Sequence, residues 1–277
     1  MRILISNDDG VHAEGIHALA EEFRKDHQVY VVAPERERST TGHSLTLHKP
    51  LRLHRWGREV YSVSGGPADC IYVGLGEVMK GKKPDLVLSG INNGANLGQD
   101  VFYSGTASAA REAANLGIPS VAVSLSLDHA KPGKPKHFAT AAKAVRASLN
   151  QVLPAFAGKA NASWKTGLNA WPKGMMLNIN VPNVAEKKLK GYRLASQGRR
   201  IYGTEILRRI DARGREYFWI GGKYQSYDPN PETDCWQVDH GYVSVTPLEL
   251  DTTMQEVFHS LQFAFELKNK RSGPKRR

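Results

Sequence analysis

Two adjacent carboxylates, Asp8 and Asp9, follow the short apolar run Ile3–Ile5 and directly precede Gly10. Like charges this close repel and raise each other's pKa unless a cation or a hydrogen-bond donor lies between them. Carboxylate oxygens are the ligands that hard cations such as Mg²⁺ and Mn²⁺ prefer. The segment therefore predicts a divalent-metal site. The alternative interpretation is a plain β-turn, because Asn, Asp and Gly dominate turns.

Further polar motifs lie beside predicted strands and helices in the first half of the chain. Ser39 follows the apolar segment Val29–Ala33, and Asn92 lies in a Gly- and Asn-rich loop after Leu86–Leu88. Their neutral oxygens are able to complete a cation site while leaving positions for water and substrate. Tyr103–Thr106 opens a predicted helix, whose first N–H groups and dipole suit an anion. Together these residue types predict metal-assisted hydrolysis of a phosphoryl group.

Each motif taken alone also has a structural interpretation. Ser39 fits a surface loop, and Ser104 and Thr106 fit the cap of a helix, which Ser and Thr favour. Four histidines match no zinc spacing and are interpreted as solvated or core-edge side chains: His12, His17, His43 and His48. The prediction of a site therefore depends on the motifs lying together at one edge of a sheet.

Apolar segments rich in β-branched residues predict the strands that place these motifs. The segments are Ile3–Ser6, Val29–Ala33, Val60–Val63, Leu86–Ser89 and Val121–Ser124. Between the first two, Ile16, Leu19, Ala20 and Phe23 recur on one face of a helix, and another helix begins near Thr106. This alternation predicts an α/β fold with a Rossmann-like, doubly wound, mostly parallel sheet. Ligands bind at the carboxyl ends of such strands, so the motifs are expected to converge on one crevice.

The second half of the chain has a different composition. A loop is predicted at Asp128–Lys136, a helix near Phe138–Leu153, strands at Leu177–Val181 and Tyr242–Val245, and a terminal helix from about Thr252. Residues 185–240 are polar, aromatic and charged, with hairpin-like pieces around Ile201–Leu207 and Glu216–Ile220. This stretch has too few apolar residues to bury a core of its own, so it is expected to pack on another subunit or on the main domain.

The net charge of the chain is +11, and the last ten residues supply +6 of it. We interpret this tail as a solvated terminus, and the alternative is contact with nucleic acid or an anionic surface. No apolar run approaches the roughly 18 residues of a membrane span. The N-terminus does not resemble a signal peptide, and the two cysteines lie far apart. These features predict a cytoplasmic protein without a membrane partner.

Five separate motifs occur in one order along the chain: Met1–Val11, Ser89–Asn92 followed by Gly94 and Asn96–Gly98, Tyr103–Thr106, Asn178–Pro182 and Val243–Leu248. In these motifs the chain resembles the SurE (survival protein E) family of 5′/3′-nucleotidases. The resemblance extends from residue 1 to about residue 262. Two positions depart from the family pattern, because Glu14 stands where the family usually has Pro and Asn93 where it usually has a small residue.

The resemblance implies a metal-dependent phosphatase of nucleoside 5′- and 3′-monophosphates, acting in some members also on short polyphosphate. It implies one divalent cation per subunit, Mg²⁺ or Mn²⁺, with the ligands Asp8, Asp9, Ser39 and Asn92. It further implies that Asn96, Ser104, Gly105 and Thr106 hold the substrate phosphate. Asp8 and Asp9 are the expected catalytic residues, and attack on phosphorus by a carboxylate or by a metal-bound water both stay open.

The resemblance also implies a single α/β domain over residues 1–262, of which 185–262 include an arm exchanged between the subunits of a homodimer or homotetramer. Residues 263–277 are then the end of the terminal helix and a disordered basic tail. One rival interpretation is a nucleotide-dependent transferase or glycosyl-bond enzyme that uses the same crevice. The other is a nucleic-acid-binding protein, motivated by the net charge. The chain lacks the dinucleotide-binding and P-loop glycine motifs.

Overall fold

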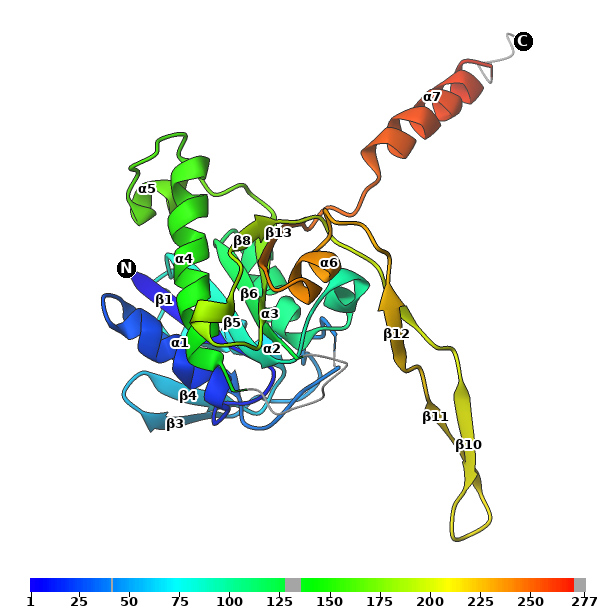
Figure 1. Ribbon diagram of the computed structural model, residues 1–277, viewed down its shortest axis with the longest axis horizontal. Coiled ribbons are helices and arrows are strands. Elements are labelled where there is room, and N and C mark those ends of the chain that lie inside the picture. Colours follow the sequence, from blue (N-terminus) through cyan, green and yellow to red (C-terminus); the bar gives the residue numbers. More distant parts are fainter. Residues whose placement is uncertain (41, 128–135, 272–277) are drawn as a thin grey trace, which may run out of the picture.

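The computed structural model describes residues 1–40, 42–127 and 136–271. In this part of the chain one central sheet has the strand order β3-β4-β2-β1-β5-β6-β7-β13-β8 (Figure 1). Its strands are β1 (Arg2–Ser6), β2 (Gln28–Pro34), β3 (Leu53–Gly57), β4 (Val60–Val63), β5 (Leu86–Asn93), β6 (Ser120–Ser126), β7 (Met175–Pro182), β8 (Tyr192–Leu194) and β13 (Val243–Glu249). Neighbouring strands are parallel except β3 beside β4 and β13 beside β7.

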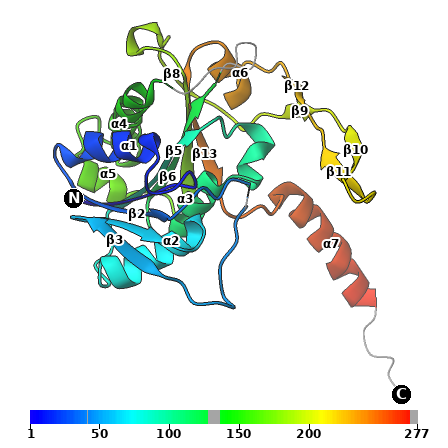
Figure 2. The ribbon, with the colours of Figure 1, turned by 90° about the horizontal axis from the view of Figure 1, so that it is seen from below.

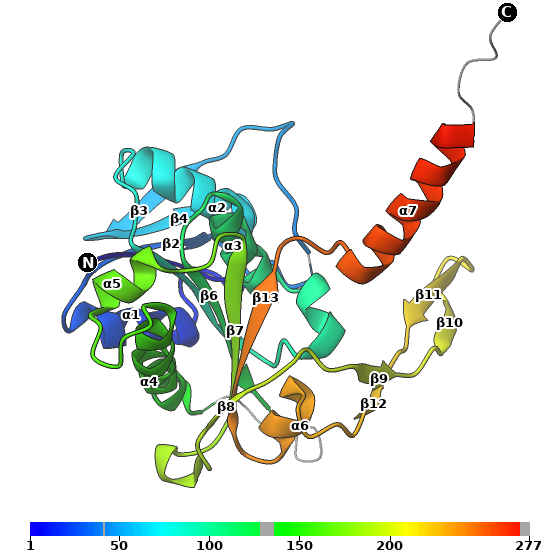
Figure 3. The ribbon, with the colours of Figure 1, turned by 90° about the horizontal axis from the view of Figure 1, so that it is seen from above.

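Helices cover both faces of this sheet. The helices α1 (Glu14–Arg24), α4 (Phe138–Phe156) and α5 (Trp164–Asn169) lie on one face, and α2 (Pro67–Val73) and α3 (Gly105–Asn115) lie on the other (Figure 3). The predicted Rossmann-like, doubly wound, mostly parallel α/β fold is confirmed. The predicted loop Asp128–Lys136 lies outside the described residues except for Lys136.

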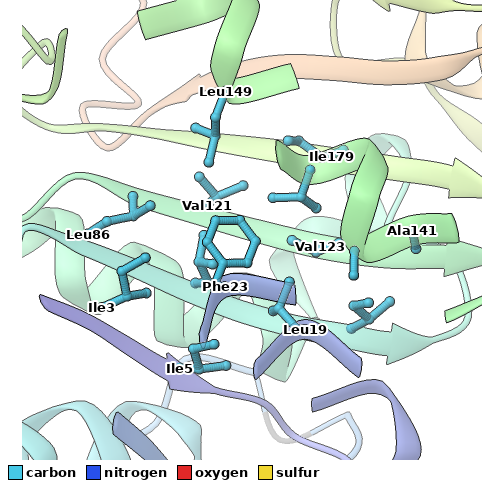
Figure 4. Close-up of a cluster of buried hydrophobic side chains, with 14 of the residues drawn as sticks. Ile3, Ile5, Leu19, Phe23, Leu86, Val121, Val123, Ala141, Leu149 and Ile179 are labelled. Atoms are coloured by element: carbon cyan, nitrogen blue, oxygen red, sulfur yellow. The ribbon is translucent and has the colours of Figure 1, made fainter. Parts of the chain in front are cut away.

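The core explains why the first strand is apolar at every inner position. Ile3 and Ile5 point toward α1, where they pack with Leu19 and Phe23 in one large cluster (Figure 4). Leu4 points to the other face and packs in a second cluster with residues of α2 and α3. The sequence of a parallel strand that is covered on both faces is a continuous run of apolar residues. Its carboxyl end, where Asp8 and Asp9 follow, is therefore desolvated by both layers.

A long arm leaves this α/β body. It contains β9 (Arg200–Tyr202) paired with β12 (Tyr224–Tyr227), and further out the hairpin of β10 (Ile206–Ile210) and β11 (Glu216–Ile220). The short helix α6 (Asp234–Asp239) leads back to β13, after which α7 (Gln255–Arg271) projects separately (Figure 1, Figure 2). Residues 268–271, predicted as part of the basic tail, belong to α7, and 272–277 lie outside the described residues. Among the described helices, none is long and apolar enough to cross a membrane.

One arginine joins α1 to α4 on the outer side of the first core cluster. The Nε of Arg146 donates to Glu22 Oε1 at 2.7 Å, and its Nη2 donates to Asp26 Oδ1 at 2.9 Å. Its guanidinium lies 4.8 Å from the centre of the Phe23 ring. The side chain therefore combines two ion pairs with packing on an aromatic face.

We expect Arg146→Ala to lower the free energy of unfolding by about 2 kcal/mol, because it leaves the buried Glu22 carboxylate without this partner and removes the ring contact. Urea denaturation measures the change. Arg24→Ala, at an exposed position of the same helix α1, is the matched control and should change stability little. Equal effects of the two substitutions would contradict this account of the helix pair.

Candidate active site

Asp8 is a nearly fully buried carboxylate, only 4% exposed, at the carboxyl end of β1. The hydroxyl of Thr106 donates to Asp8 Oδ1 at 2.5 Å. Burial is the largest influence on the pKa of Asp8 and, with the neighbouring charge of Asp9, raises it to about 6 despite the hydrogen bonds from Thr106, which lower it. Asp9 Oδ2 accepts the N–H of Asn93 at 3.1 Å, and burial raises the pKa of Asp9 as well. Both carboxylates therefore lie where a cation would offset the cost of ionising them.

The turn after β1 holds this acidic pair in place. The side chain of Asn7 donates to the carbonyl of Gly10 at 2.9 Å and accepts its N–H at 3.2 Å. Gly10 has φ +101°, and a Cβ there would lie 3.2 Å from the backbone carbonyl carbon of Arg36. The β-turn interpretation of this segment and the site interpretation are thus compatible, because the turn is what presents the two carboxylates.

The two neutral oxygen donors reach the same edge from neighbouring strands. Asn92 lies near the end of β5, which pairs directly with β1. Its Nδ2 donates to the carbonyl of Gly94 at 2.9 Å, so the amide group is oriented, and its Oδ1 is the atom that could hold a cation. Ser39 is exposed in the connection after β2, and its hydroxyl donates to Glu37 at 2.6 Å. The adjacent Arg38 N–H donates to the carbonyl of Asp8 at 2.7 Å, which ties this connection to the acidic pair.

The first turn of α3 abuts Asp8. Ser104 is the N-cap of this helix, and its hydroxyl oxygen accepts the N–H of Ala107 at 3.0 Å. A Cβ on Gly105 would lie 2.7 Å from Asp8 Cβ and Oδ2, so the close approach requires glycine. The cap interpretation of Ser104 is confirmed. It is compatible with phosphate binding, because the proton of the hydroxyl is not used in the cap.

Asn96 lies in a buried polar network rather than in an open loop. Its Nδ2 donates to Ser124 Oγ at 2.8 Å, and its N–H donates to Asn180 Oδ1 at 2.9 Å. The side-chain amides of Asn178 and Asn180 donate to the carbonyl of Asn96 at 2.8 and 3.0 Å. The predicted phosphate contact of Asn96 stays a prediction. The sequence analysis did not identify Asn178 and Asn180 as partners of Asn96. Their spacing of two residues in an apolar strand does place both side chains on the same face of the sheet.

The base of the arm is fixed to the loop that follows Asn96. The buried carboxylate of Asp234 accepts the N–H of Gly98 at 3.0 Å and the N–H of Gly198 at 2.9 Å. Arg200 and Asp100 form an ion pair at 2.5 Å beside this junction. Burial raises the pKa of Asp234 above its ordinary value, although the N–H groups of Gly98 and Gly198 act to lower it. Sequence reasoning did not identify Asp234, whose local sequence predicts only a helix start.

The donor set suits a hard cation. In residues 1–40, 42–127 and 136–271, no three or more His, Cys, Asp and Glu side chains cluster as a metal site. The predicted set does not require such a cluster, since it combines the carboxylates of Asp8 and Asp9 with one hydroxyl and one amide oxygen. Mg²⁺ binds through one or two carboxylates and keeps other positions for water and phosphate oxygens. The residues present therefore fit Mg²⁺ or Mn²⁺.

Comparisons with known proteins identify the family of this chain. The family model for survival protein SurE matches residues 3–204. The 5′-nucleotidase SurE of Vibrio parahaemolyticus is 42% identical over 261 residues, which cover 94% of this chain and 93% of that protein. The 5′-nucleotidase SurE of Anaeromyxobacter dehalogenans strain 2CP-1 is 44% identical over 264 residues, covering 95% of each chain.

A solved structure extends the agreement to the whole fold. The crystal structure of the Sure protein from Aquifex aeolicus superposes with a TM-score of 0.79 at 38% identity, covering 95% of this chain and 99% of that chain. The relatives and the solved structure thus cover almost the whole of this chain, whereas the family model ends at residue 204, near the start of the arm. The chain accordingly belongs to the SurE family and is a 5′-nucleotidase, a phosphoric monoester hydrolase that acts on nucleoside monophosphates.

Proposed function

We propose that this 5′-nucleotidase also hydrolyses nucleoside 3′-monophosphates and short polyphosphate, and that its activity requires one divalent cation per subunit, Mg²⁺ or Mn²⁺. The proposed ligands are Asp8, Asp9, Ser39 and Asn92. The observation that carries the proposal is the acidic pair after β1, in which Asp8 is buried and Asp9 is partly buried. Burial raises the pKa of each carboxyl, although hydrogen-bond donors act to lower it. We further propose a cytoplasmic localisation, which suits the two buried free thiols of Cys70 and Cys235.

The residues of the chain supply orientation and charge around the reacting phosphate. When bound, the cation supplies positive charge that polarises the phosphoryl group and activates water. Thr106 fixes Asp8 and the Asn93 N–H fixes Asp9, so neither carboxylate has to reorganise during the reaction. The hydroxyl of Ser104 and the first turn of α3 add a donor and the positive end of the helix dipole toward the substrate phosphate.

Removal of the metal tests the reaction class. We expect phosphate release from nucleoside 5′- and 3′-monophosphates in the presence of Mn²⁺ or Mg²⁺. The release should stop when EDTA is added, because the cation supplies the positive charge that polarises the phosphoryl group. The measurement is a phosphate assay over a panel of both isomers and short polyphosphate, with re-addition of each metal. Turnover that survives thorough chelation would overturn the metal proposal without affecting the family assignment.

A single isosteric substitution tests the acidic pair. Asp8→Asn should lower kcat/KM about 1,000-fold, since it removes one ligand charge where the transition state needs it. Its melting temperature should be equal to or above that of the unmodified protein, because the substitution removes the charge of the buried Asp8 and with it the repulsion from the neighbouring Asp9. Thermal unfolding and steady-state kinetics measure the two effects. Asp228→Asn, on the arm, is the control that should retain turnover, and an active Asp8→Asn enzyme would refute the ligand assignment.

We also propose that the arm is exchanged between subunits of a homodimer or homotetramer. Large apolar side chains of α7 and its approach are exposed, namely Met254, Val257, Phe258, Leu261 and Phe265. The outer hairpin exposes Ile206, Ile210, Phe218, Trp219 and Ile220. An isolated hairpin is marginal in water, and a contiguous exposed apolar face marks an interaction site.

A cavity of about 830 Å³ at the start of α7 offers a place for part of a second subunit. Its apolar lining includes Val101 and Phe102 before α3, Leu194 of β8, Leu248 of β13, and Leu250, which follows β13. These residues come from the body and from the approach to α7. A partner's apolar helix seated there would cover surface that a single chain leaves exposed to water.

Charge on the apolar face of α7 should dissociate the assembly. In the double variant Phe258→Asp with Leu261→Asp, we expect light scattering after size exclusion to give the mass of one chain, 30.6 kDa, because a buried unpaired carboxylate opposes docking. Ser260→Asp, on a different face of the same helix, is the matched control and should keep the mass of the unmodified protein. An unmodified protein that runs as a single chain would overturn the exchange proposal.

A further inference from the structure

The connection between β2 and β3 carries a proposed metal ligand but has no helix or strand of its own in the residues described. It spans residues 35–52, of which all but Thr41 are described. Ser39 lies in it as an exposed side chain whose hydroxyl donates to Glu37. Fixing such a segment costs conformational entropy, so a ligand placed on it needs contacts that restrain it. The question is which contacts hold Ser39 over the acidic pair.

The first restraint lies directly before Ser39. The N–H of Arg38 donates to the carbonyl of Asp8 at 2.7 Å, and the guanidinium Nη2 donates to the carbonyl of Ser64 at 2.9 Å. These bonds tie the start of the connection to the ends of β1 and β4. By themselves they leave the chain beyond Ser39 free to turn away from the site.

The second restraint follows Ser39 by four residues. His43 Nε2 lies 2.6 Å from Glu112 Oε2, and the carboxylate side chain is only 5% exposed. The hydroxyl of Tyr72 on α2 also forms a hydrogen bond with Glu112, and this bond raises the pKa of Tyr72. Burying a carboxylate without hydrogen-bond donors is costly, so His43 and Tyr72 together make the buried position of Glu112 between α3, α2 and this connection possible.

A third restraint lies further along the chain. The N–H and the hydroxyl of Thr46 donate to Asp69 Oδ1 and Oδ2 at 2.8 and 2.7 Å. Asp69 also accepts the N–H of Gly66 at 2.8 Å at the start of α2. Among the described residues of this connection, Thr46 provides the next hydrogen bonds to the body after His43. If His43 is lost, the span between these restraints therefore grows from residues 38–43 to residues 38–46.

Helix α3 is the common support of both parts of the site. Its first turn contributes Thr106, which orients the carboxylate of Asp8, and two turns later Glu112 holds His43 of the connection. We propose that His43 and Glu112 are positioning residues for the metal site, which hold the Ser39 segment at a fixed distance from Asp8 and thereby strengthen binding of the divalent cation. This inference rests on the proposed metal dependence and on Ser39 as a ligand.

The test measures metal binding directly, without turnover. The full-length protein is titrated with Mn²⁺ in the absence of substrate, and free Mn²⁺ is followed by electron paramagnetic resonance. His43→Ala should raise the Kd for Mn²⁺ about 10-fold, the usual effect of removing a group that orients a metal ligand. His43→Gln keeps a side-chain N–H donor and should restore most of the affinity. His48→Ala, an exposed histidine of the same connection, is the matched control and should bind as the unmodified protein does.

A second readout separates positioning from folding. Amide hydrogen exchange of residues 38–46 should be faster in His43→Ala, whereas exchange in the strands of the sheet should be unchanged. Affinity in His43→Ala equal to that of the unmodified protein, while Ser39→Ala is weakened, would overturn the positioning role alone. Unchanged affinity in Ser39→Ala would instead remove Ser39 from the ligand set, and absence of Mn²⁺ binding to the unmodified protein would overturn the proposed metal dependence itself.

Discussion

Burial of Asp8 beside Asp9 is the constraint around which this molecule is arranged. β1 is the inner strand whose two faces are covered by α1 and by the pair of α2 and α3, so the residues at its end lose water from both sides. The same packing that stabilises the sheet therefore raises the pKa of Asp8. A fold that holds two carboxylates there must supply donors or a cation, and the donors found are the Thr106 hydroxyl and the Asn93 N–H. Each donor restricts the direction of a carboxylate and occupies only one of its oxygen atoms.

The packing of α3 links core and site. Ala109 and Ala113 on this helix belong to the cluster formed with Leu4, and small side chains there allow the helix to approach the sheet closely. The approach places Gly105 against Asp8, where any larger residue would collide with the carboxylate. Glu112, on another side of the helix, is buried toward the connection after β2. A change in the position of α3 would move Asp8 and the Ser39 segment, which carry two of the proposed ligands, together. The geometry of the proposed site therefore depends on the packing of the core as well as on the ligands.

Much of the fold could be predicted from the sequence because the apolar periodicity of the body is regular. Ile3–Ser6 and Val60–Val63 are strands almost to the residue, whereas β5 continues past Ser89 to Asn93 through an irregular pairing with β6 at Gly90, which no alternation pattern encodes. At the site, the types of Asp8 and Asn92 predict oxygen donors, but the partners of Asn96 do not follow from its neighbours. Two of them, Asn178 and Asn180, lie 82 and 84 residues away on β7, and the sheet order brings them beside the loop. Local sequence specifies a side chain's chemistry, and long-range pairing specifies its direction.

The arm shows that local sequence is equally limited in predicting how subunits associate. Its composition indicates that residues 185–240 cannot bury a core of their own, but composition does not tell where the arm points. In the structure its base is fixed to the body by Asp234, which bonds the loop after Asn96 at Gly98 and the arm at Gly198. The outer hairpin and α7 then present apolar side chains to solvent. Because this junction also holds the loop that bears a proposed phosphate contact, a partner seated on the arm would act on that loop through Asp234 and through the ion pair of Arg200 with Asp100. The proposed assembly and the proposed phosphate contact would therefore be coupled at this junction rather than at the acidic pair.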